Sequence, residues 1–513
     1  MSTAPRNSLE VTALDILQNL AYGFSVALTP TNLFCCFMGV FIGTLIGVLP
    51  GIGPVGTMSI LLPVTFRTSP VTAIIMLAGI YYSAQYGGST TSILLNIPGE
   101  ASSVITCLDG YKLARKGRAG PALGMAAFAS FIAGTMGVVL LSFLAPPLAR
   151  VALRFGPPEY FSIMCLGLSL IIYLAAGSIP KALMMVLLGL ILSQVGQDNL
   201  TAVARFTYDI PELYDGIGLV PIVMGIFGLG EVFYNLEKEM SADIYQAKIQ
   251  GLLPSIRDWL DSLWAIGQGT VIGFFLGILP GGGAVIASFV TYGLQKNFSK
   301  RPEMLGTGVI EGVAAPESAN NAAAQGSFIP LFTLGVPSNV VMALLLGALI
   351  IHGVTPGPFL LSENAAVFWG TVTSMYIGNA MLLFLNLPLI PLWVQLLKVP
   401  YYKVLFPSII LFCLIGAYAI NNAVADVVFM VVFGGVGYLM KKFKYEPAPL
   451  TLGFVLGPLF ETSLRHSLQL SDGNLFIFFT RPISAIGLGI AILLLSYPIL
   501  TFFLGKKRRV FQE

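Results

Sequence analysis

Long apolar stretches separated by short polar loops recur from one end of the 513-residue chain to the other. They have the length that a helix needs to cross about 30 Å of hydrocarbon, and they lack the short alternating segments of a membrane β-barrel. The pattern predicts an all-α polytopic membrane protein with roughly ten to twelve transmembrane helices. The clearest crossings lie near Leu33–Leu49, Pro121–Phe143, Phe161–Ala176, Ala182–Val195, Phe368–Leu387, Val404–Ala419, Val427–Met440, Leu450–Phe460 and Ile483–Leu504.

Two apolar stretches are interrupted in the same way. GTLIGVLPGIGP at Gly43–Pro54 and GFFLGILPGGGA at Gly273–Ala284 align without a gap, 230 positions apart. Proline removes a backbone donor, and glycine adopts dihedrals that other residues avoid. Because lipid cannot bond the freed amides, such a break has to lie inside protein or against a wet cavity. The sequence therefore predicts broken or re-entrant helices at the midplane, and a pair of them in corresponding halves points to a transporter's binding site.

A second pair of breaks follows the first. Gln85–Glu100 has its counterpart in Ala324–Asn339, where Gly87 and Pro98 match Gly326 and Pro337 at a spacing of 239. We therefore expect two membrane repeats. The predicted divisions are an amphipathic lead-in at 1–30, a first repeat at 31–235, a cytoplasmic linker at 236–258, a second repeat at 259–505 and a basic cytoplasmic tail at 506–513.

The basic residues favour inverted topology of the two repeats. The loop Lys112–Arg118 is basic, whereas its counterpart Ile351–Gly357 contains no Lys or Arg. Lys441–Lys444 is also basic, and its counterpart Pro211–Tyr214 is not. Since cytoplasmic loops collect Lys and Arg, equivalent positions are expected to face opposite sides of the membrane. A parallel duplication whose loops have drifted stays open as the alternative.

Four segments that contain the breaks have no Lys, Arg, Asp or Glu, namely Gly43–Phe66, Gly79–Gly99, Gly273–Gln295 and Ala324–Ile351. A solute held there would therefore be bound mainly by backbone and neutral groups. Amides at the start of a half-helix carry partial positive charge and suit an anion, and freed carbonyls suit Na⁺. The competing interpretation is that these small residues only allow close helix packing. The residues predicted to bind substrate are Pro50, Gly51, Ile52, Gly53, Ser89, Thr90, Thr91, Asn96, Pro98, Gly99, Pro280, Gly281, Gly282, Gly283, Asn320, Asn321, Pro337, Ser338 and Asn339.

Ion coupling is predicted at Thr57, Ser92, Glu311 and Glu317. Ionisable groups at membrane depth are usually functional, so the two glutamates are candidates to bind a cation or carry a proton. Both equally fit a wet loop, and that alternative stays open. No resident cofactor is predicted, and the coupling ion is Na⁺ or H⁺.

Composition excludes several classes of function. Charged residues make up 10% of the chain, against about 25% in a soluble protein, which places the chain in a lipid bilayer. No basic stripe with interleaved aromatic residues indicates nucleic acid, and the five cysteines lack metal-ligand spacing, so no metal site is predicted. The sequence has no metalloprotease, nucleophile-elbow or phosphate-loop motif. It therefore predicts no enzyme, and transport would run on an ion gradient or on another subunit.

GVLPGIGP, YGGSTTSILLNIPGE, GILPGGGA and APESANNAA resemble the large permease subunit of the tripartite tricarboxylate transporters, the TctA type, over essentially the whole chain. The resemblance implies a carrier of the bacterial inner membrane that takes up citrate-like or other carboxylates with a Na⁺ or proton gradient. It further implies two partners, a small four-helix membrane subunit of the TctB type and a periplasmic solute-binding protein of the TctC type.

Two other classes of function remain to be separated from a carrier. Carbonyl-lined turns also form selectivity filters, so an anion-selective channel is the main alternative. A membrane scaffold or lipid-modifying enzyme is the second, although the clustered His, Asp or Glu that such an enzyme needs are missing from the sequence. A carrier accumulates its substrate against a gradient, and a channel only dissipates the gradient.

Overall fold

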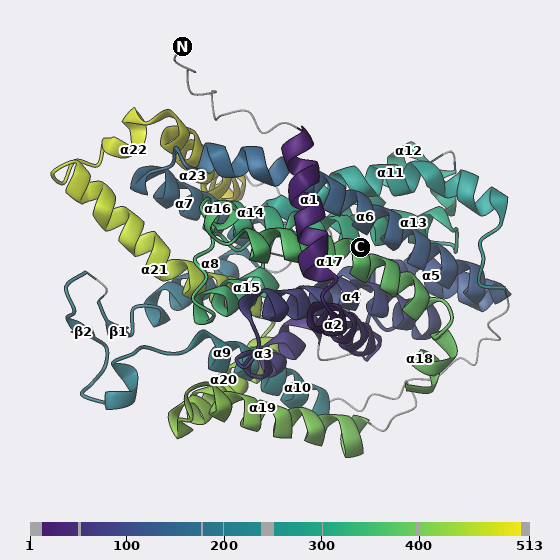
Figure 1. Cartoon of the computed structure of the whole chain (residues 1–513), viewed down its shortest axis with the longest axis horizontal. Helices are drawn as coiled ribbons and strands as arrows, with labels where there is room; N and C mark the ends of the chain where they lie inside the picture. Colours follow the sequence, from purple (N-terminus) through teal and green to yellow (C-terminus); the bar gives the residue numbers. More distant parts are fainter. Residues whose placement is uncertain are drawn as a thin grey trace, which may run out of the picture.

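The computed structural model describes residues 13–49, 53–175, 178–198, 200–237, 251–299, 301–396 and 401–503. These residues form helices and one two-stranded antiparallel hairpin (Figure 1). Up to residue 237 the elements are α1 (Ala13–Ala27), α2 (Pro30–Val48), α3 (Gly53–Thr65), α4 (Pro70–Leu95), η1 (Ala101–Val104), α5 (Thr106–Leu113), η2 (Ala114–Arg118), α6 (Ala119–Ala152), α7 (Pro157–Leu174), α8 (Ile179–Leu192), β1 (Gly196–Gln197), β2 (Ala204–Arg205), η3 (Pro211–Leu213), α9 (Leu219–Val223), η4 (Met224–Leu229) and α10 (Gly230–Glu237).

The elements after residue 250 are α11 (Ile256–Ile278), α12 (Gly283–Phe298), η5 (Pro302–Met304), α13 (Glu311–Gly326), α14 (Phe328–Leu334), α15 (Val340–Ile351), α16 (Leu360–Glu363), α17 (Ala365–Asn386), α18 (Ile390–Leu396), η6 (Tyr401–Leu405), α19 (Phe406–Asn421), α20 (Val424–Lys442), α21 (Pro447–Leu470), α22 (Ile477–Thr480) and α23 (Pro482–Phe503). Eight of the described helical spans are long and apolar enough to cross a membrane, and four shorter helices are also apolar. The predicted all-α polytopic membrane fold is confirmed.

The first break of each half reverses the direction of the chain. In the second half α11 runs parallel to α13, since a Cβ on Gly273 would lie 2.7 Å from Cα of Ala319 and one on Gly277 would approach Ala323 equally closely. After the break α12 runs back, because Ser288 contacts Pro316 and Gln295 contacts Glu311. The break between α11 and α12 is therefore a hairpin.

The first half repeats this arrangement. A Cβ on Gly43 of α2 would lie 2.8 Å from Cα of Ile80, and one on Gly47 would lie 3.0 Å from Cα of Ala84, so α2 and α4 are parallel. Helix α3 ends at Thr65, only a short turn before α4 begins at Pro70. It therefore returns toward the start of α2, as α12 does toward the start of α11.

At the second break of each half, one helix ends in a left-handed residue and a new helical segment begins a few residues later. Asn96 and Gly335, which are equivalent at the spacing of 239, both have left-handed backbone, with φ of 57° and 70°. Glu100 and Asn339, also equivalent, then cap the next helical segment by accepting hydrogen bonds from backbone amides. Matching conformations at matching positions show that the two halves share one local design.

Equivalent helices of the two halves cross in antiparallel fashion. Ser89 near the end of α4 contacts Glu317 in α13, whereas Tyr81, two turns earlier, packs on Phe328 of α14 with ring centroids 6.2 Å apart. An antiparallel crossing of equivalent helices is the geometry that inverted repeats require. The inverted topology relative to a membrane stays a prediction, and this crossing is the observation that supports it.

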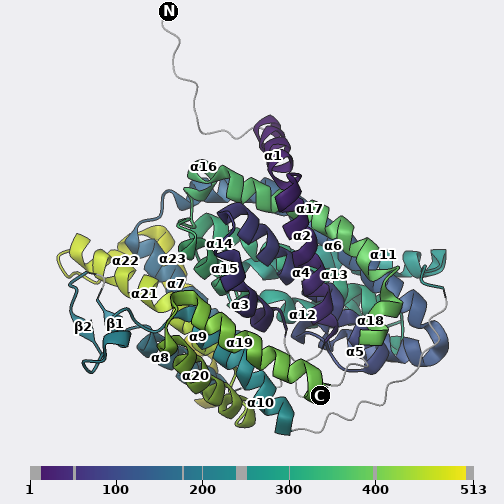
Figure 2. The same ribbon diagram turned by 60° about the horizontal axis from the view of Figure 1, so that its bottom comes forward.

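The helices pack into two groups that do not coincide with the two halves of the sequence (Figure 2). The tip group contains the broken helices, α1–α6 with α11–α17. The flank group contains α7–α10 and α19–α23, in which α8 packs on α21 while α20 packs on η4 and α10. Helices α3 and α15 contact both groups. The predicted basic tail lies outside the described residues, as do residues 1–12 of the lead-in and residues 238–250 of the linker.

Candidate functional site

The two breaks of the second half touch each other. The backbone N–H of Gly281 donates a hydrogen bond to the carbonyl of Ser338 at 2.8 Å. Gly281 has a φ of +77°, and a Cβ on it would lie 2.9 Å from Cα of Ile171 in α7. Only glycine fits there, for reasons of both backbone conformation and space. This tip therefore lies where the tip group meets the flank group.

The second break of the first half lies against α2 and α4. Pro50, Gly51 and Ile52 lie outside the described residues. The backbone N–H of Gly99 donates to the carbonyl of Gly88 at 3.4 Å, and a Cβ on Gly99 would clash with the carbonyl oxygen of Gly47. The second break of this half thus packs against the end of α2, next to the first break.

Glu317 is held at the crossing of the two halves. Its side chain is fully buried. Ser89 of α4 donates to its Oε2 at 2.5 Å, Ser130 of α6 lies 3.4 Å from the same oxygen, and Thr106 of α5 donates to Oε1. Ser89 and Glu317 are both predicted site residues, and the fold brings them together from opposite halves. Thr106 and Ser130 were not predicted, because no local motif marks them.

The remaining predicted residues are spread along the same helices. Thr90 borders a cavity of about 10 Å³ beside Ser89 and Ser130. Asn339 donates to the hydroxyl of Tyr81 at 3.2 Å, which ties the second break of one half to α4 of the other. The other placements are Ser92 donating to Ser103, Asn321 donating to Asn320, Thr57 donating to the carbonyl of Gly53, and Glu311 accepting from Ser299 and Gln295 at the start of α13.

Glu100 is a polar residue that the sequence interpretation missed. It follows Gly99 directly and stands just outside the segment identified as free of charge. Its carboxylate accepts from the backbone N–H of Ser102 at 2.8 Å, and the Ser102 hydroxyl also donates to Gln85. The signal was available, because the spacing of 239 pairs Glu100 with the predicted residue Asn339.

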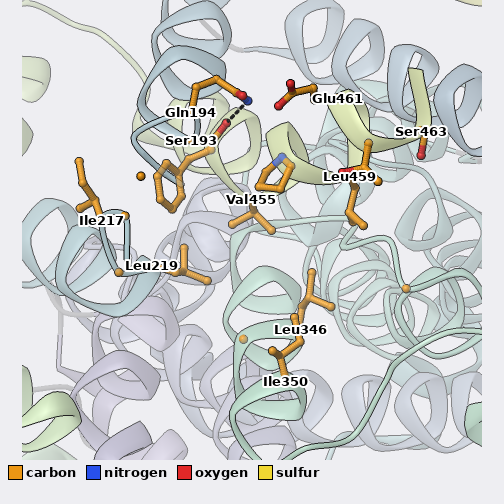
Figure 3. A pocket seen from close by; sticks show the side chains of 18 of the residues that line it. Ser193, Gln194, Ile217, Leu219, Leu346, Ile350, Val455, Leu459, Glu461 and Ser463 are labelled. Carbon is orange, nitrogen blue, oxygen red and sulfur yellow. Dashed lines mark hydrogen bonds between the residues drawn. The ribbon is translucent and has the colours of Figure 1, made fainter. Parts of the chain in front are cut away.

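A larger cavity of about 1370 Å³ lies between the ends of α7, α8, α15 and α21 (Figure 3). Apolar side chains such as Leu346 and Ile350 of α15 form one wall, and Gln194 and Glu461 lie on the opposite wall. None of the described residues predicted to bind substrate lines it. The nearest of them in the chain is Pro337, two positions after the lining residue Gly335.

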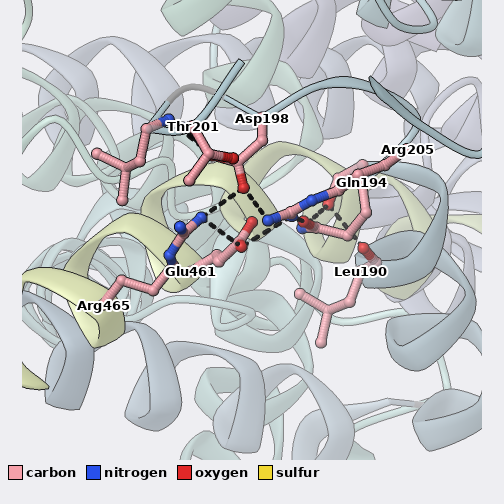
Figure 4. A network of polar contacts seen from close by, with 9 residues as sticks. Leu190, Gln194, Asp198, Thr201, Arg205, Glu461 and Arg465 are labelled. Atoms are coloured by element: carbon pink, nitrogen blue, oxygen red, sulfur yellow. Dashed lines mark hydrogen bonds and ion pairs between the residues drawn. The ribbon is translucent and has the colours of Figure 1, made fainter. Parts of the chain in front are cut away.

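Four charged side chains form a closed network on one wall of this larger cavity (Figure 4). Arg205 and Arg465 each contact both Asp198 and Glu461, with 2.8 Å from Arg205 to Glu461 and 2.5 Å from Arg465 to Asp198. Asp198 and Arg205 belong to the hairpin region of the first half, and Glu461 and Arg465 to α21 of the second. The network therefore connects the halves through fully compensated charges.

The structure thus combines a large cavity between two helix groups, paired helix breaks and a buried acid. The sequence of the chain matches a family of transporters. Residues 33–452 match the model of the tripartite tricarboxylate transporter TctA family. An Agrobacterium vitis protein named "Uncharacterized 52.8 kDa protein in TAR-I ttuC' 3'region" is 52% identical over 98% of this chain and 99% of its own length. A second one from that organism, "Uncharacterized protein in TAR-II ttuC' 3'region", is 52% identical over 47% of this chain and 99% of its own length. No solved structure matches the chain. The chain is a multi-pass membrane protein that belongs to the tripartite tricarboxylate transporter TctA family.

Proposed function

We propose that the protein is the permease subunit of a secondary transporter that imports tricarboxylates or other organic carboxylates across the bacterial inner membrane. A periplasmic solute-binding protein delivers the anion, and a small four-helix membrane subunit completes the assembly. Membership of the TctA family supports the transporter role. The observation that carries the proposal is the contact of Gly281 with Ser338, because it brings two helix breaks together at the boundary between the helix groups.

The residues at the four helix breaks bind the anion mainly through their backbone. The described residues predicted to bind substrate are all uncharged, so attraction for a carboxylate has to come from backbone amides and neutral side chains. An anion placed at a helix start gains about 0.3–1 kcal/mol from the helix dipole, and up to about 2 when partly buried. Several amides aimed at one position form an anion site without a fixed positive charge.

Transport follows from movement of the tip group against the flank group. The two groups meet at Gly281 and along α3 and α15, and the larger cavity also lies between them. A rigid-body displacement there carries the bound solute past the flank group, as in other carriers built from broken helices. A Na⁺ or proton gradient supplies the energy, because the sequence holds no phosphate-binding loop.

Reconstitution tests this function. The chain is placed in proteoliposomes with the small membrane subunit and the solute-binding protein, and uptake of radiolabelled citrate, malate and succinate is followed with and without an imposed ion gradient. We expect saturable uptake that accumulates one of these anions above its outside concentration. Uptake that stops at equal concentrations would assign the protein to the channels instead.

A further inference from the structure

Glu317 is a buried acid without a positive partner. Its side chain has no exposed surface, and none of the ion pairs among the described residues includes it. An ionised carboxylate in an apolar environment is very costly unless a positive charge compensates it, and such a group binds a proton instead. Glu317 therefore differs from every ion-paired acid of the described chain.

The elements packed against Glu317 supply no compensating charge. Helices α4, α5, α6, α11 and α12 pack on α13, as do η1 and α14. Tyr86 of α4 and Cys107 of α5 interact electrostatically with Glu317, and neither is positive. Glu100, which accepts a hydrogen bond from Ser102, is also acidic and supplies no positive charge. The other charged residues of these helices stand near their ends, namely Asp109 and Lys112 of α5, Arg150 of α6, Arg257, Asp258 and Asp261 of α11, and Lys296 of α12.

The groups around the Glu317 carboxylate suit a proton. The hydroxyls of Ser89 and Thr106 contact its two oxygens directly. Hydroxyl groups both donate and accept hydrogen bonds. The hydroxyls of Ser89, Thr106 and Ser130 can therefore form hydrogen bonds with the ionised carboxylate and also with its protonated form.

A small cavity adjoins this site. Its volume is about 10 Å³ and its lining includes Ser89, Ser130 and Tyr86; about 10–15 Å³ is the least that holds one water molecule. The hydroxyl of Tyr86 is buried and has no hydrogen-bond partner among the described residues. A water molecule in this cavity would satisfy Tyr86 and connect it with the hydroxyls that bond Glu317.

We infer that Glu317 carries the coupling proton. The inference rests on the proposed function and identifies its coupling ion. One proton binds a carboxylate oxygen of Glu317 when the tip group is loaded, and the same proton passes to water on the other side when the solute leaves. Protonation removes one negative charge from the tip group, which moves with the anion. The loaded state therefore crosses the membrane at a lower free-energy cost.

The test uses the three-component proteoliposomes with radiolabelled citrate, malate and succinate. Uptake is driven either by an inward proton gradient without Na⁺ or by an inward Na⁺ gradient at equal pH. A third arm measures counterflow, in which labelled solute exchanges with unlabelled solute without any gradient. For wild type we expect accumulation with the proton gradient alone. Glu317→Gln cannot release a proton, so we expect about tenfold lower accumulation, with counterflow kept.

Glu303→Gln, an exposed carboxyl of η5, is the matched control and should accumulate solute as wild type does. Accumulation by wild type with the Na⁺ gradient alone, or unchanged accumulation by Glu317→Gln, would overturn the inference and leave the proposed function standing. Absence of both uptake and counterflow in wild type would remove the proposed function itself. The wild-type gradients need no variant, so accumulation with the Na⁺ gradient alone would overturn the inference even where Glu317→Gln fails to fold.

Discussion

The Glu317 site and the Arg205–Arg465 network both connect the two halves, but they treat charge in opposite ways. In the network two guanidinium groups face two carboxylates, and every charge has a partner. At the Glu317 site one carboxylate accepts from the hydroxyls of Ser89, Thr106 and Ser130, and no ion pair among the described residues includes it. The network side chains of Arg205, Arg465 and Glu461 are 29% exposed, whereas Glu317 is fully buried.

This difference assigns a structural role to the Arg205–Arg465 network and a proton-binding role to the Glu317 site. Compensated charges at a cavity wall hold two elements together and have no reason to change protonation. An uncompensated buried carboxyl is stable only when it binds a proton or another cation, so its state follows the solution on the side to which it opens. Four predictions test this contrast and the helix tips on which transport depends.

The largest effect is expected at the tip between the two helix groups. Gly281→Val should abolish uptake, because valine is strained at a φ of +77° and its Cβ would lie 2.9 Å from the backbone of Ile171. Uptake in proteoliposomes measures the effect, and size-exclusion chromatography checks that the protein is still inserted and folded. Gly293→Val is the matched control, since Gly293 in α12 has open space around it. Normal transport by Gly281→Val would contradict the proposed role of the tip.

The second prediction compares the two glutamates of α13. Glu317→Gln should lower gradient-driven accumulation about tenfold, whereas Glu311→Gln should have a much smaller effect. Glu311 lies at the start of the helix and accepts from Ser299 at 2.7 Å and Gln295 at 3.2 Å, so a glutamine keeps an oxygen for one of these contacts. Accumulation under a proton gradient measures both. Equal losses in the two variants would show that position on α13 does not decide function.

The third prediction concerns the stability of the network. Asp198→Asn should lower the free energy of unfolding by about 2 kcal/mol, the size of charge-assisted hydrogen bonds lost from a buried acceptor. Asparagine keeps an oxygen for the amides of Leu200 and Thr201, so the loss reports mainly the contacts with Arg205 and Arg465. Thermal unfolding in detergent measures it. The coupling ion should stay the same, and a change of coupling ion would refute the assignment of the network to structure.

The smallest effect is expected within the Glu317 site. Ser130 lies 3.4 Å from Oε2, a weak hydrogen bond, whereas Ser89 lies at 2.5 Å. We therefore expect Ser130→Ala to change accumulation by less than about twofold and Ser89→Ala to change it more. Both variants are compared in one uptake experiment with a proton gradient. The reverse order would mean that Ser130 contributes more than its distance indicates.

Much of the fold follows from the sequence because the chemistry of a membrane helix is local. An apolar run of sufficient length predicts a crossing, and a Pro-Gly pair inside it predicts a break, since lipid offers the freed amides no partner. The spacing of 239 correctly pairs Asn96 with Gly335, which share left-handed backbone. The site was predicted less completely. Glu317 and Ser89 were both named, but nothing in the sequence indicated that they touch.

The sequence by itself determined the membrane class, the positions of the helix breaks and the charge-free character of the tips, because each depends on residues close together in the chain. Only the tertiary structure decided that α12 returns along α13, that Thr106 and Ser130 reach Glu317, and that Glu311 lies elsewhere. The larger cavity and its ionic network also come from the fold alone. These features depend on contacts between residues far apart in the chain, and no periodicity or spacing encodes which helix faces will meet.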